Sequence, residues 1–397
     1  MLLNEKHWTL IPFGIELYHG LPGVILFLAY LGTVTDQKRY TELARAALIT
    51  LQRQIESSKA SITSIGGFEG WGGVIYTLTH LGVLWNDPDL LNEAELLGEI
   101  LPDLIEKNKN LDIISGAAGC IGSLISLYRC RPSQSILAAA IQCGDLIISH
   151  AQTTEGSVGW LPEDAGEKPL SGFSHGAAGM AWALLELASL TGDLRFRTTA
   201  LAAIEYERSL FCPEVRNWTD LRYVSGSSAL SYVSSLPDLS YFPSAILSDN
   251  KDYQHICMTA WCHGAPGIGL ARLRCLQHLD DAAIRAEINT ALQTTLDQGF
   301  GHNHSLCHGD LGNLELLLQA SLTLDDPQWK TQVDRLAAII LESIDKHGWL
   351  CGVPLGVETP GLMTGLAGIG YGLLRLAAPE RVPSVLVLEH PLLNSAV

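Results

Sequence analysis

Seven copies of one short pattern, a Gly-x-x-Gly pair followed by an apolar run rich in alanine and leucine, constrain the fold of this chain. The runs are too apolar on all sides for surface helices, and glycine permits close backbone approaches that a Cβ atom would block. Each copy is therefore predicted to be a turn that opens a buried helix. The first glycines of the pairs are Gly20, Gly70, Gly116, Gly176, Gly264, Gly309 and Gly365.

Amphipathic segments lie between the copies and are predicted to form a second, outer set of helices. Repeated helical units bury their apolar faces by stacking, so the chain is predicted to be all-α, a closed (α/α)7 toroid. If each outer helix precedes its inner partner, the first inner helix has no mate. The predicted outer helices span 38–56, 88–107, 133–152, 192–210, 280–298 and 326–346, with Asp87-Pro88 and Asp326-Pro327 as an N-cap residue and N1 proline.

The whole chain, 1–397, is predicted to be a single domain with one loop-rich insertion around 211–255, in the longest interval between copies. The insertion is rich in Ser, Asn, Asp, Tyr and Pro and is expected to cover one face of the ring. Asp220 and Arg222 within it are expected to be a solvated pair. The missing mate of the first helix also suggests a domain excised from a longer protein.

Composition excludes several classes of partner. A formal charge of −17 and a pI near 5.1 argue against nucleic acid and against an anionic membrane surface, because both reward clustered Lys and Arg. No apolar run approaches the length of a membrane span. Nine cysteines without the spacing of a disulfide scaffold fit a reducing compartment. A cytoplasmic location is therefore expected.

The residues directly before the first glycines should face one another, because equivalent turns of a closed ring converge at one end of its cavity. The tripeptide Cys-His-Gly occurs twice among them, at 262–264 and 307–309. Thiolate and imidazole are preferred zinc ligands, and a catalytic site has three protein ligands and one open position. Cys262, Cys307 and one of His263 and His308 fit that count. The alternative is that both cysteines are buried apolar residues and both histidines stabilise turns.

The pattern resembles the lanthionine synthetase C-like family over nearly the whole chain, from Tyr18-His19-Gly20 to Gly365-Leu366-Ala367-Gly368. In that family one turn supplies a Trp-Cys ligand and the next a Cys-His pair, which match Trp261-Cys262 and Cys307-His308-Gly309. The resemblance therefore implies that Zn²⁺ is bound by Cys262, Cys307 and His308. The segments 217–222 and 261–267 look most like the C-terminal cyclase half of bifunctional class II lanthipeptide synthetases.

The resemblance also implies a reaction and a partner. The reaction is addition of a peptide cysteine thiol to dehydroalanine or dehydrobutyrine in the same dehydrated precursor peptide, and a dehydratase domain or partner protein would supply that peptide. His175 matches the family's catalytic histidine, Asp112 matches a turn aspartate, and His263 is a neighbour that could assist proton transfer. Where some members have an arginine four residues before the first cysteine ligand, this chain has Met258, so that arginine's role has no counterpart here.

Other functions remain open from the residues alone, because fold does not fix function. They are a related enzyme that adds glutathione to dehydrated residues, a non-catalytic zinc-containing toroid that binds peptides, and an α/α-toroid glycosidase or prenyltransferase. A glycosidase needs a pair of carboxylates, whereas Glu69 is the only carboxylate directly before a first glycine. Purely structural zinc is normally bound by four ligands, which speaks against the scaffold.

Overall fold

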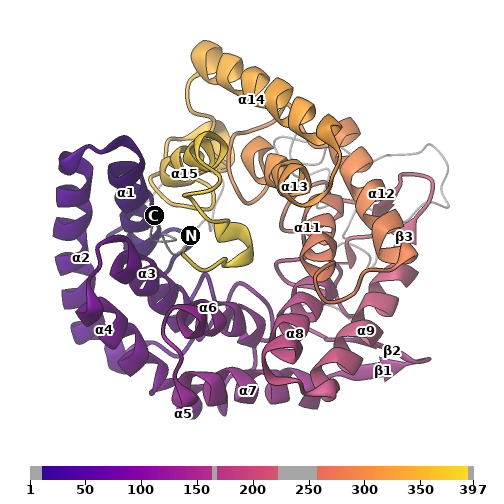
Figure 1. Ribbon diagram of the computed structural model, residues 1–397, viewed down its shortest axis with the longest axis horizontal. Helices are drawn as coiled ribbons and strands as arrows, with labels where there is room; N and C mark the ends of the chain where they lie inside the picture. Colours follow the sequence, from indigo (N-terminus) through magenta and orange to yellow (C-terminus); the bar gives the residue numbers. More distant parts are fainter. Residues whose placement is uncertain (1–10, 163–167, 222–256, 392–397) are drawn as a thin grey trace.

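The computed structural model describes residues 11–162, 168–221 and 257–391. In this part of the chain two concentric rings of helices alternate along the sequence, as predicted (Figure 1). The inner helices are α1 (Leu21–Thr35), α3 (Trp71–Leu84), α6 (Ala117–Cys130), α8 (Ala177–Thr191), α11 (Ala265–Cys275), α13 (Asp310–Thr323) and α15 (Leu366–Ala377). The outer helices are α2 (Lys38–Ser58), α4 (Pro88–Gly98), α5 (Leu101–Ile105), α7 (Gln134–Ser149), α9 (Leu194–Ser209), α12 (Ala282–Gln298) and α14 (Pro327–His347).

The two sets of helices differ in burial as their sequences predict. In α3 every residue from Trp71 to Gly82 is buried, whereas α2 buries only the stripe Ala44, Leu48, Leu51 and Ile55. Asp87 and Asp326 accept backbone N–H bonds from the first turns of α4 and α14, which confirms both predicted caps. The outer layer is therefore amphipathic and the inner layer is core.

Apart from the short α5, which packs on α7, each outer helix packs mainly on the inner helix that precedes it, as α2 does on α1 and α14 on α13. The expectation that the first inner helix lacks an outer partner, which assumed that each outer helix precedes its inner partner, is therefore wrong. In the described residues, α15 is the inner helix that no outer partner follows. The ring closes because α15 also packs on α1. Short connections carry the remaining elements: strands β1 (Gln152–Thr154), β2 (Ser157–Gly159), β3 (Phe211–Cys212) and β4 (Asn217–Trp218), and 3-10 helices η1 (Lys59–Ser61), η4 (Pro354–Gly356) and η5 (Val385–Val387).

A closed circle of backbone hydrogen bonds joins the seven turns. In six of the seven turns, the residue two positions before the first glycine donates its N–H to the next turn, and in the third turn Ile113 donates to Ser174 O (3.0 Å). The circle ends where it began, with Cys307 N donating to Met363 O (2.8 Å) and Met363 N donating to Tyr18 O (3.0 Å). The second glycine of each pair is required because a Cβ atom at Gly267 or Gly312 would overlap the carbonyl oxygen of Trp261 or Leu306. The turns are thus fixed side by side at one end of the ring.

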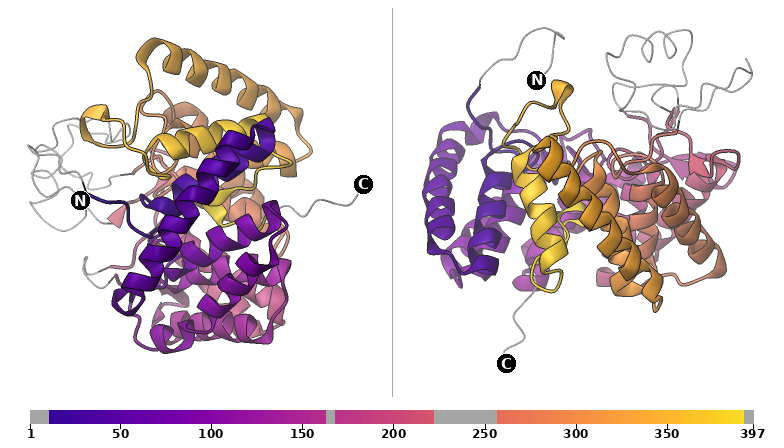
Figure 2. Two further views of the ribbon diagram at one scale, coloured as in Figure 1. Left: turned by 90° about the vertical axis from the view of Figure 1, so that its left-hand side faces the viewer. Right: turned by 90° about the horizontal axis from the view of Figure 1, so that it is seen from above.

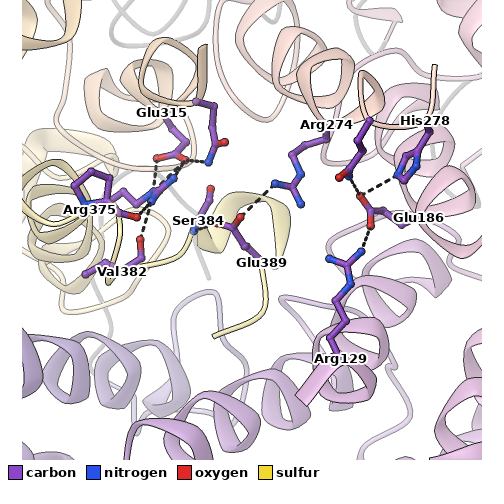
Figure 3. Close-up of polar contacts among 12 residues, drawn as sticks. Arg129, Glu186, Arg274, His278, Glu315, Arg375, Val382, Ser384 and Glu389 are labelled. Carbon is purple, nitrogen blue, oxygen red and sulfur yellow. Dashed lines mark hydrogen bonds and ion pairs between the residues drawn. The ribbon is translucent and has the colours of Figure 1, made fainter. Parts of the chain in front are cut away.

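The segment after α15 turns back into the centre of the ring (Figure 1). It enters from the end where the inner helices finish, since Glu389 accepts a bond from Arg274 in the last turn of α11 (3.2 Å; Figure 3). Its η5 residues are almost wholly buried, and Leu386 O accepts the indole N–H of Trp261 (3.2 Å). This C-terminal plug, residues 382–390, fills the axis of the toroid below the turns.

Ion pairs around the plug link the ends of neighbouring helices (Figure 3). Glu186 of α8 pairs with Arg129 of α6 (2.7 Å), and Glu315 of α13 pairs with Arg375 of α15 (3.3 Å). In the side views the indigo α1 and the yellow α15 lie side by side, where the ring closes (Figure 2). No helix in the described residues is both long and apolar enough to cross a membrane.

Candidate metal and proton-transfer site

Two cysteine sulfurs lie together at the circle of turns. Cys262 and Cys307 occupy the same position in the fifth and sixth turns, and Cys262 N donates to Cys307 O (3.3 Å). Both side chains are nearly buried, at 8% and 5% exposure. The pKa of the Cys307 thiol lies well below its usual range because Cys262 donates a hydrogen bond to its sulfur, with further donors in His308 and Tyr18, and these outweigh burial. The site is therefore built to hold negative charge on sulfur.

The imidazole of His308 lies beside this pair and is oriented by the backbone. Its Nε2 is 3.1 Å from the carbonyl oxygen of Gly352, which can only accept, so Nε2 carries the proton. Nδ1 is then the ring nitrogen on the side of Cys307: protonated, it donates to that sulfur, and deprotonated, it offers a lone pair to a metal ion. Metal-binding histidines commonly show this arrangement, in which the other ring N–H is bonded to a carbonyl.

The donor set fits zinc in kind, because it consists of two sulfurs and one imidazole. Within the described residues, however, no group of three or more histidine, cysteine, aspartate or glutamate side chains is already assembled to hold a metal ion. The contacts of Cys307 with Cys262 and His308 bring the three predicted ligands into one cluster without completing coordination geometry. Metal binding is therefore treated below as a proposal.

A histidine–aspartate pair lies in the adjoining turns. Nδ1 of His175 is 2.5 Å from Oδ2 of Asp112, so Nδ1–H donates to the carboxylate and Nε2 is left for a substrate. Asp112 also caps its own turn, because its Oδ1 accepts Ser115 N–H (2.8 Å). The His175 side chain is 39% exposed, in keeping with access from solvent. Asp112 thus both caps its own turn and accepts the Nδ1–H of His175.

His263 joins the two halves of the site. Its ring stacks on that of His175, with centroids 5.8 Å apart and planes 22° apart, and it directly follows Cys262. The residue is buried, at 1% exposure. The structure therefore gathers all six predicted site residues at one end of the ring, with His263 between the sulfur pair and the proton-transfer pair.

Other polar side chains in and near the turns make contacts of their own. Glu69 accepts a bond from Ser115 (3.1 Å), and its charge adds to burial in raising the pKa of Glu16, so these two carboxyl groups lie near each other. His304 is buried and bonds to Ser343 (3.0 Å), and Cys351 bonds to a carbonyl oxygen. These side chains form hydrogen bonds within the loops around the site.

The first residues of the insertion, 211–221, lie within the described part of the chain and stabilise the fifth turn. Asn217 is fully buried, and its Oδ1 accepts the N–H of Ala265 in the first turn of α11 (2.9 Å), where Cys262-His263-Gly264 leads into the helix. Asp220 is 2% exposed, so the expectation of a solvated residue is wrong for it. Arg222, and the insertion from 222 to 256, lie outside the described residues.

Tyr18 is the contact that sequence reasoning missed. Its hydroxyl bonds to the sulfur of Cys307, and burial together with the negative charge of Cys307 raises the pKa of the phenol, so it remains a donor. In the sequence Tyr18 resembles the other apolar residues that precede a glycine. Its position, two residues before the first glycine as in Cys262 and Cys307, was the available signal.

The fold and this site together define an α/α toroid that carries a pair of thiols beside a histidine–aspartate pair. The model of the family described as lanthionine synthetase C-like protein matches residues 12–387, and the chain belongs to that family. The family resemblance seen in the sequence and the predicted toroid are thereby confirmed.

Two curated relatives and one solved structure give the range of similarity. The lacticin 481/lactococcin biosynthesis protein LcnDR2 of Lactococcus lactis subsp. lactis is 28% identical over 32% of this chain, which spans only 15% of that protein's length. Glutathione S-transferase LANCL1 of Danio rerio is 22% identical over 79% of this chain and 83% of its own. Nisin cyclase has a TM-score of 0.71 at 17% identity, covering 94% of this chain and 92% of its own, which shows the shared fold.

Proposed function

We propose that this protein is a zinc-dependent lanthipeptide cyclase, which closes thioether rings in a dehydrated precursor peptide. The observation that carries the proposal is the joint position of the thiol pair, Cys262 and Cys307, and the His175–Asp112 pair at one end of the toroid. A thioether ring needs both functions, because a thiol must become a thiolate and the carbon next to the new bond must gain a proton. Membership of the lanthionine synthetase C-like family supports the same reaction.

Cys262, Cys307 and His308 would hold the zinc ion. The ion would supply deprotonation of the substrate's cysteine, since a free thiol with a pKa of about 8.5 is only a few per cent thiolate at neutral pH. The protein's own part would be to hold two sulfurs and one imidazole around the ion, with His308 Nε2 donating to Gly352 O.

The proton balance is simple. The substrate sulfur releases its proton to solvent and forms a bond to the β-carbon of dehydroalanine or dehydrobutyrine, and the electron pair of the double bond moves toward the α-carbon and its carbonyl. Nε2–H of His175 then delivers one proton to the α-carbon, and Nε2 takes up a proton from solvent. Asp112 orients this acid, because its carboxylate accepts Nδ1–H and leaves Nε2 for the substrate. No atom is gained or lost, so the product has the mass of the substrate.

The first test counts thiols. The protein is incubated with a dehydrated, cysteine-containing peptide, and free thiols are alkylated and measured by mass spectrometry, because ring closure leaves the mass unchanged. Loss of alkylation in step with time supports the cyclase. Full alkylation at the end of the reaction with a cognate peptide would exclude it.

The metal site is tested separately. Metal analysis of the purified wild type should give about one zinc per chain, and Cys262→Ala should lose most of it. Cys351→Ala is the matched control, since Cys351 is also a nearly buried thiol near these loops but bonds to Thr359 O rather than to a second sulfur. Equal zinc in the wild type and Cys262→Ala would refute the ligand assignment.

A second candidate function uses the same site with glutathione as the thiol. It is favoured by the relative named glutathione S-transferase, which matches this chain over 83% of its own length. The two reactions separate cleanly, because glutathione addition raises the mass of the peptide by that of glutathione whereas cyclisation does not change it. Reactions with and without glutathione on one dehydrated peptide therefore decide between them.

A further inference from the structure

A buried glutamate of the outer ring holds the turn that carries His175. Glu207, near the end of outer helix α9, is fully buried, and its Oε1 accepts the backbone N–H of Gly172 (2.9 Å). Gly172 lies three residues before His175 in the same turn. One carboxylate of the outer layer therefore reaches the backbone on which the proposed acid is carried.

Gly172 in turn packs against the neighbouring part of the site. Its φ is +96°, and a Cβ atom there would lie 3.1 Å from Cα and 3.3 Å from Nδ1 of His263. The ring of His263 stacks on that of His175. The place of Gly172 thus affects both imidazoles, one through the chain and one through direct packing.

The negative charge of Glu207 is matched inside the protein. Its Oε2 accepts a bond from Nη2 of Arg272 on inner helix α11 (3.0 Å), and neither side chain has any exposed surface. Nε of Arg272 donates to Glu287 of α12 (2.6 Å). Arg272 therefore fixes the carboxylate through one oxygen while the other oxygen is committed to Gly172.

Stability alone does not account for this arrangement. A buried ion pair adds little to stability, because the cost of removing both charges from water offsets their attraction, and apolar residues of similar volume often replace such a pair without loss. An apolar side chain cannot accept the N–H of Gly172, however, and a buried N–H without an acceptor is costly. What Glu207 supplies in particular is the acceptor that holds the turn.

We propose that Glu207 is a positioning residue of the proton-transfer pair, which fixes turn 171–175 so that His175 presents Nε2 to the substrate. Arg272 acts one step further away, by holding Glu207. The inference rests on the proposed function for its effect on catalysis, whereas its effect on the imidazole of His175 is measurable without a substrate.

The experiment replaces the ion pair in two ways. Glu207→Gln with Arg272→Met removes both charges but keeps a side-chain oxygen for Gly172 N–H, whereas Glu207→Leu with Arg272→Met removes that oxygen as well. Cyclisation by the zinc-loaded proteins gives kcat and KM, and NMR of 15N-histidine-labelled protein gives the imidazole shifts of His175, assigned with His175→Asn. Urea unfolding reports stability.

The control removes a second nearly buried ion pair that lies beside the C-terminal plug. It is Glu315→Leu with Arg375→Met, whose side chains are 3.3 Å apart on α13 and α15. A further variant, Glu207→Asp, keeps the charge opposite Arg272 and shortens the reach toward Gly172 by one methylene group. It decides the question if the double variants at 207 and 272 do not fold.

The Leu variant should lose about ten-fold in kcat with KM within about two-fold of wild type, because a small displacement of a catalytic group slows the reaction more than it weakens binding. Its His175 shifts should change. The Gln variant should recover most of the wild-type kcat and shifts, Glu207→Asp should fall between, and the control pair should change stability but neither kcat nor shifts.

Unchanged kcat or unchanged His175 shifts in the folded Leu variant, or in Glu207→Asp if the double variants do not fold, would overturn the inference. Equal losses of kcat in the Gln and Leu variants would also overturn it, since the charges rather than the bond to Gly172 would then matter. An inactive wild type would refute the proposed function instead, and the His175 shifts would still test the positioning.

Discussion

Nδ1 of His175 lies 2.5 Å from Oδ2 of Asp112, and this contact joins the turns of the third and fourth repeats. It fixes which ring nitrogen faces the substrate, because Nδ1–H is committed to the carboxylate. The same carboxylate group caps its own turn through Ser115 N–H. Asp112 therefore stabilises its own turn and also orients the imidazole of the proposed acid.

Asp112→Asn separates these two roles. The amide oxygen can still accept Ser115 N–H, so the turn should persist, whereas the amide nitrogen would replace the carboxylate oxygen that accepts Nδ1–H of His175. Cyclisation should slow by about 100-fold at neutral pH, within the range of general acid–base catalysis. Cyclisation rates of the wild type and the variant check the prediction, with thermal unfolding of both as the control.

His175 and His263 compete for the role of acid, and paired substitutions distinguish them. His175 donates Nδ1–H to the carboxylate of Asp112, which leaves its Nε2 for the substrate, so His175→Asn should lose cyclisation by about 100-fold or more. His263→Asn removes the stacked neighbour and should cost about ten-fold or less. Both variants should retain zinc, because neither side chain is a predicted ligand. The reverse order of effects would assign the acid to His263.

The sequence predicts the ring well because its signal repeats. A single Gly-x-x-Gly says little, but Gly267 and Gly312 recur in equivalent places, and in each the missing Cβ is what lets the helix meet its own turn. Since the ring closes, spacing in the sequence becomes proximity in space. That is why the repeat pattern alone groups Cys262, Cys307 and His175 at one end of the toroid.

The other features of the structure depend on contacts that no repeated sequence pattern indicates. The plug around Leu388 follows the last copy and has neither helical nor strand periodicity, so nothing in its sequence places it on the axis. Asp220 lies in a polar stretch and looks solvated, yet neighbouring elements bury it. Tyr18 resembles an ordinary core aromatic. Its contact with Cys307 appears only when the first and last turns meet.

Leu388→Ala tests the plug. Leu388 is 3% exposed and packs against Gly67 and Gly122 of the inner ring, so its truncation should lower the free energy of unfolding by about 2–4 kcal/mol. Leu355→Ala is a matched control, because Leu355 also has positive φ (64°, against 45° for Leu388) but is 84% exposed. That change should stay within about 0.5 kcal/mol. Urea unfolding of both variants gives the comparison, and equal losses would mean that the plug is not core.

Acid should destabilise the base of the toroid through His80. This histidine is fully buried: Tyr30 O–H donates to its Nδ1 (2.7 Å), and its Nε2–H donates to Glu389 O (3.1 Å). Burial lowers the pKa of His80 from 6.5 to about 3. A depressed histidine pKa means that the unfolded chain binds the proton first, so stability is full above pH 6.5 and falls between pH 6.5 and about 3.

His80→Gln, which has one acceptor and one donor for the same two partners, should remove this dependence. From pH 6.5 to pH 5 the wild type should lose about 2 kcal/mol more unfolding free energy than the variant, at about 1.4 kcal/mol per pH unit. Urea titrations at both pH values measure the difference. An equal loss of unfolding free energy in the two proteins would show that other groups cause the acid sensitivity. An unfolding free energy of the variant that does not change with pH would assign it to His80, the imidazole that joins α3 to the plug.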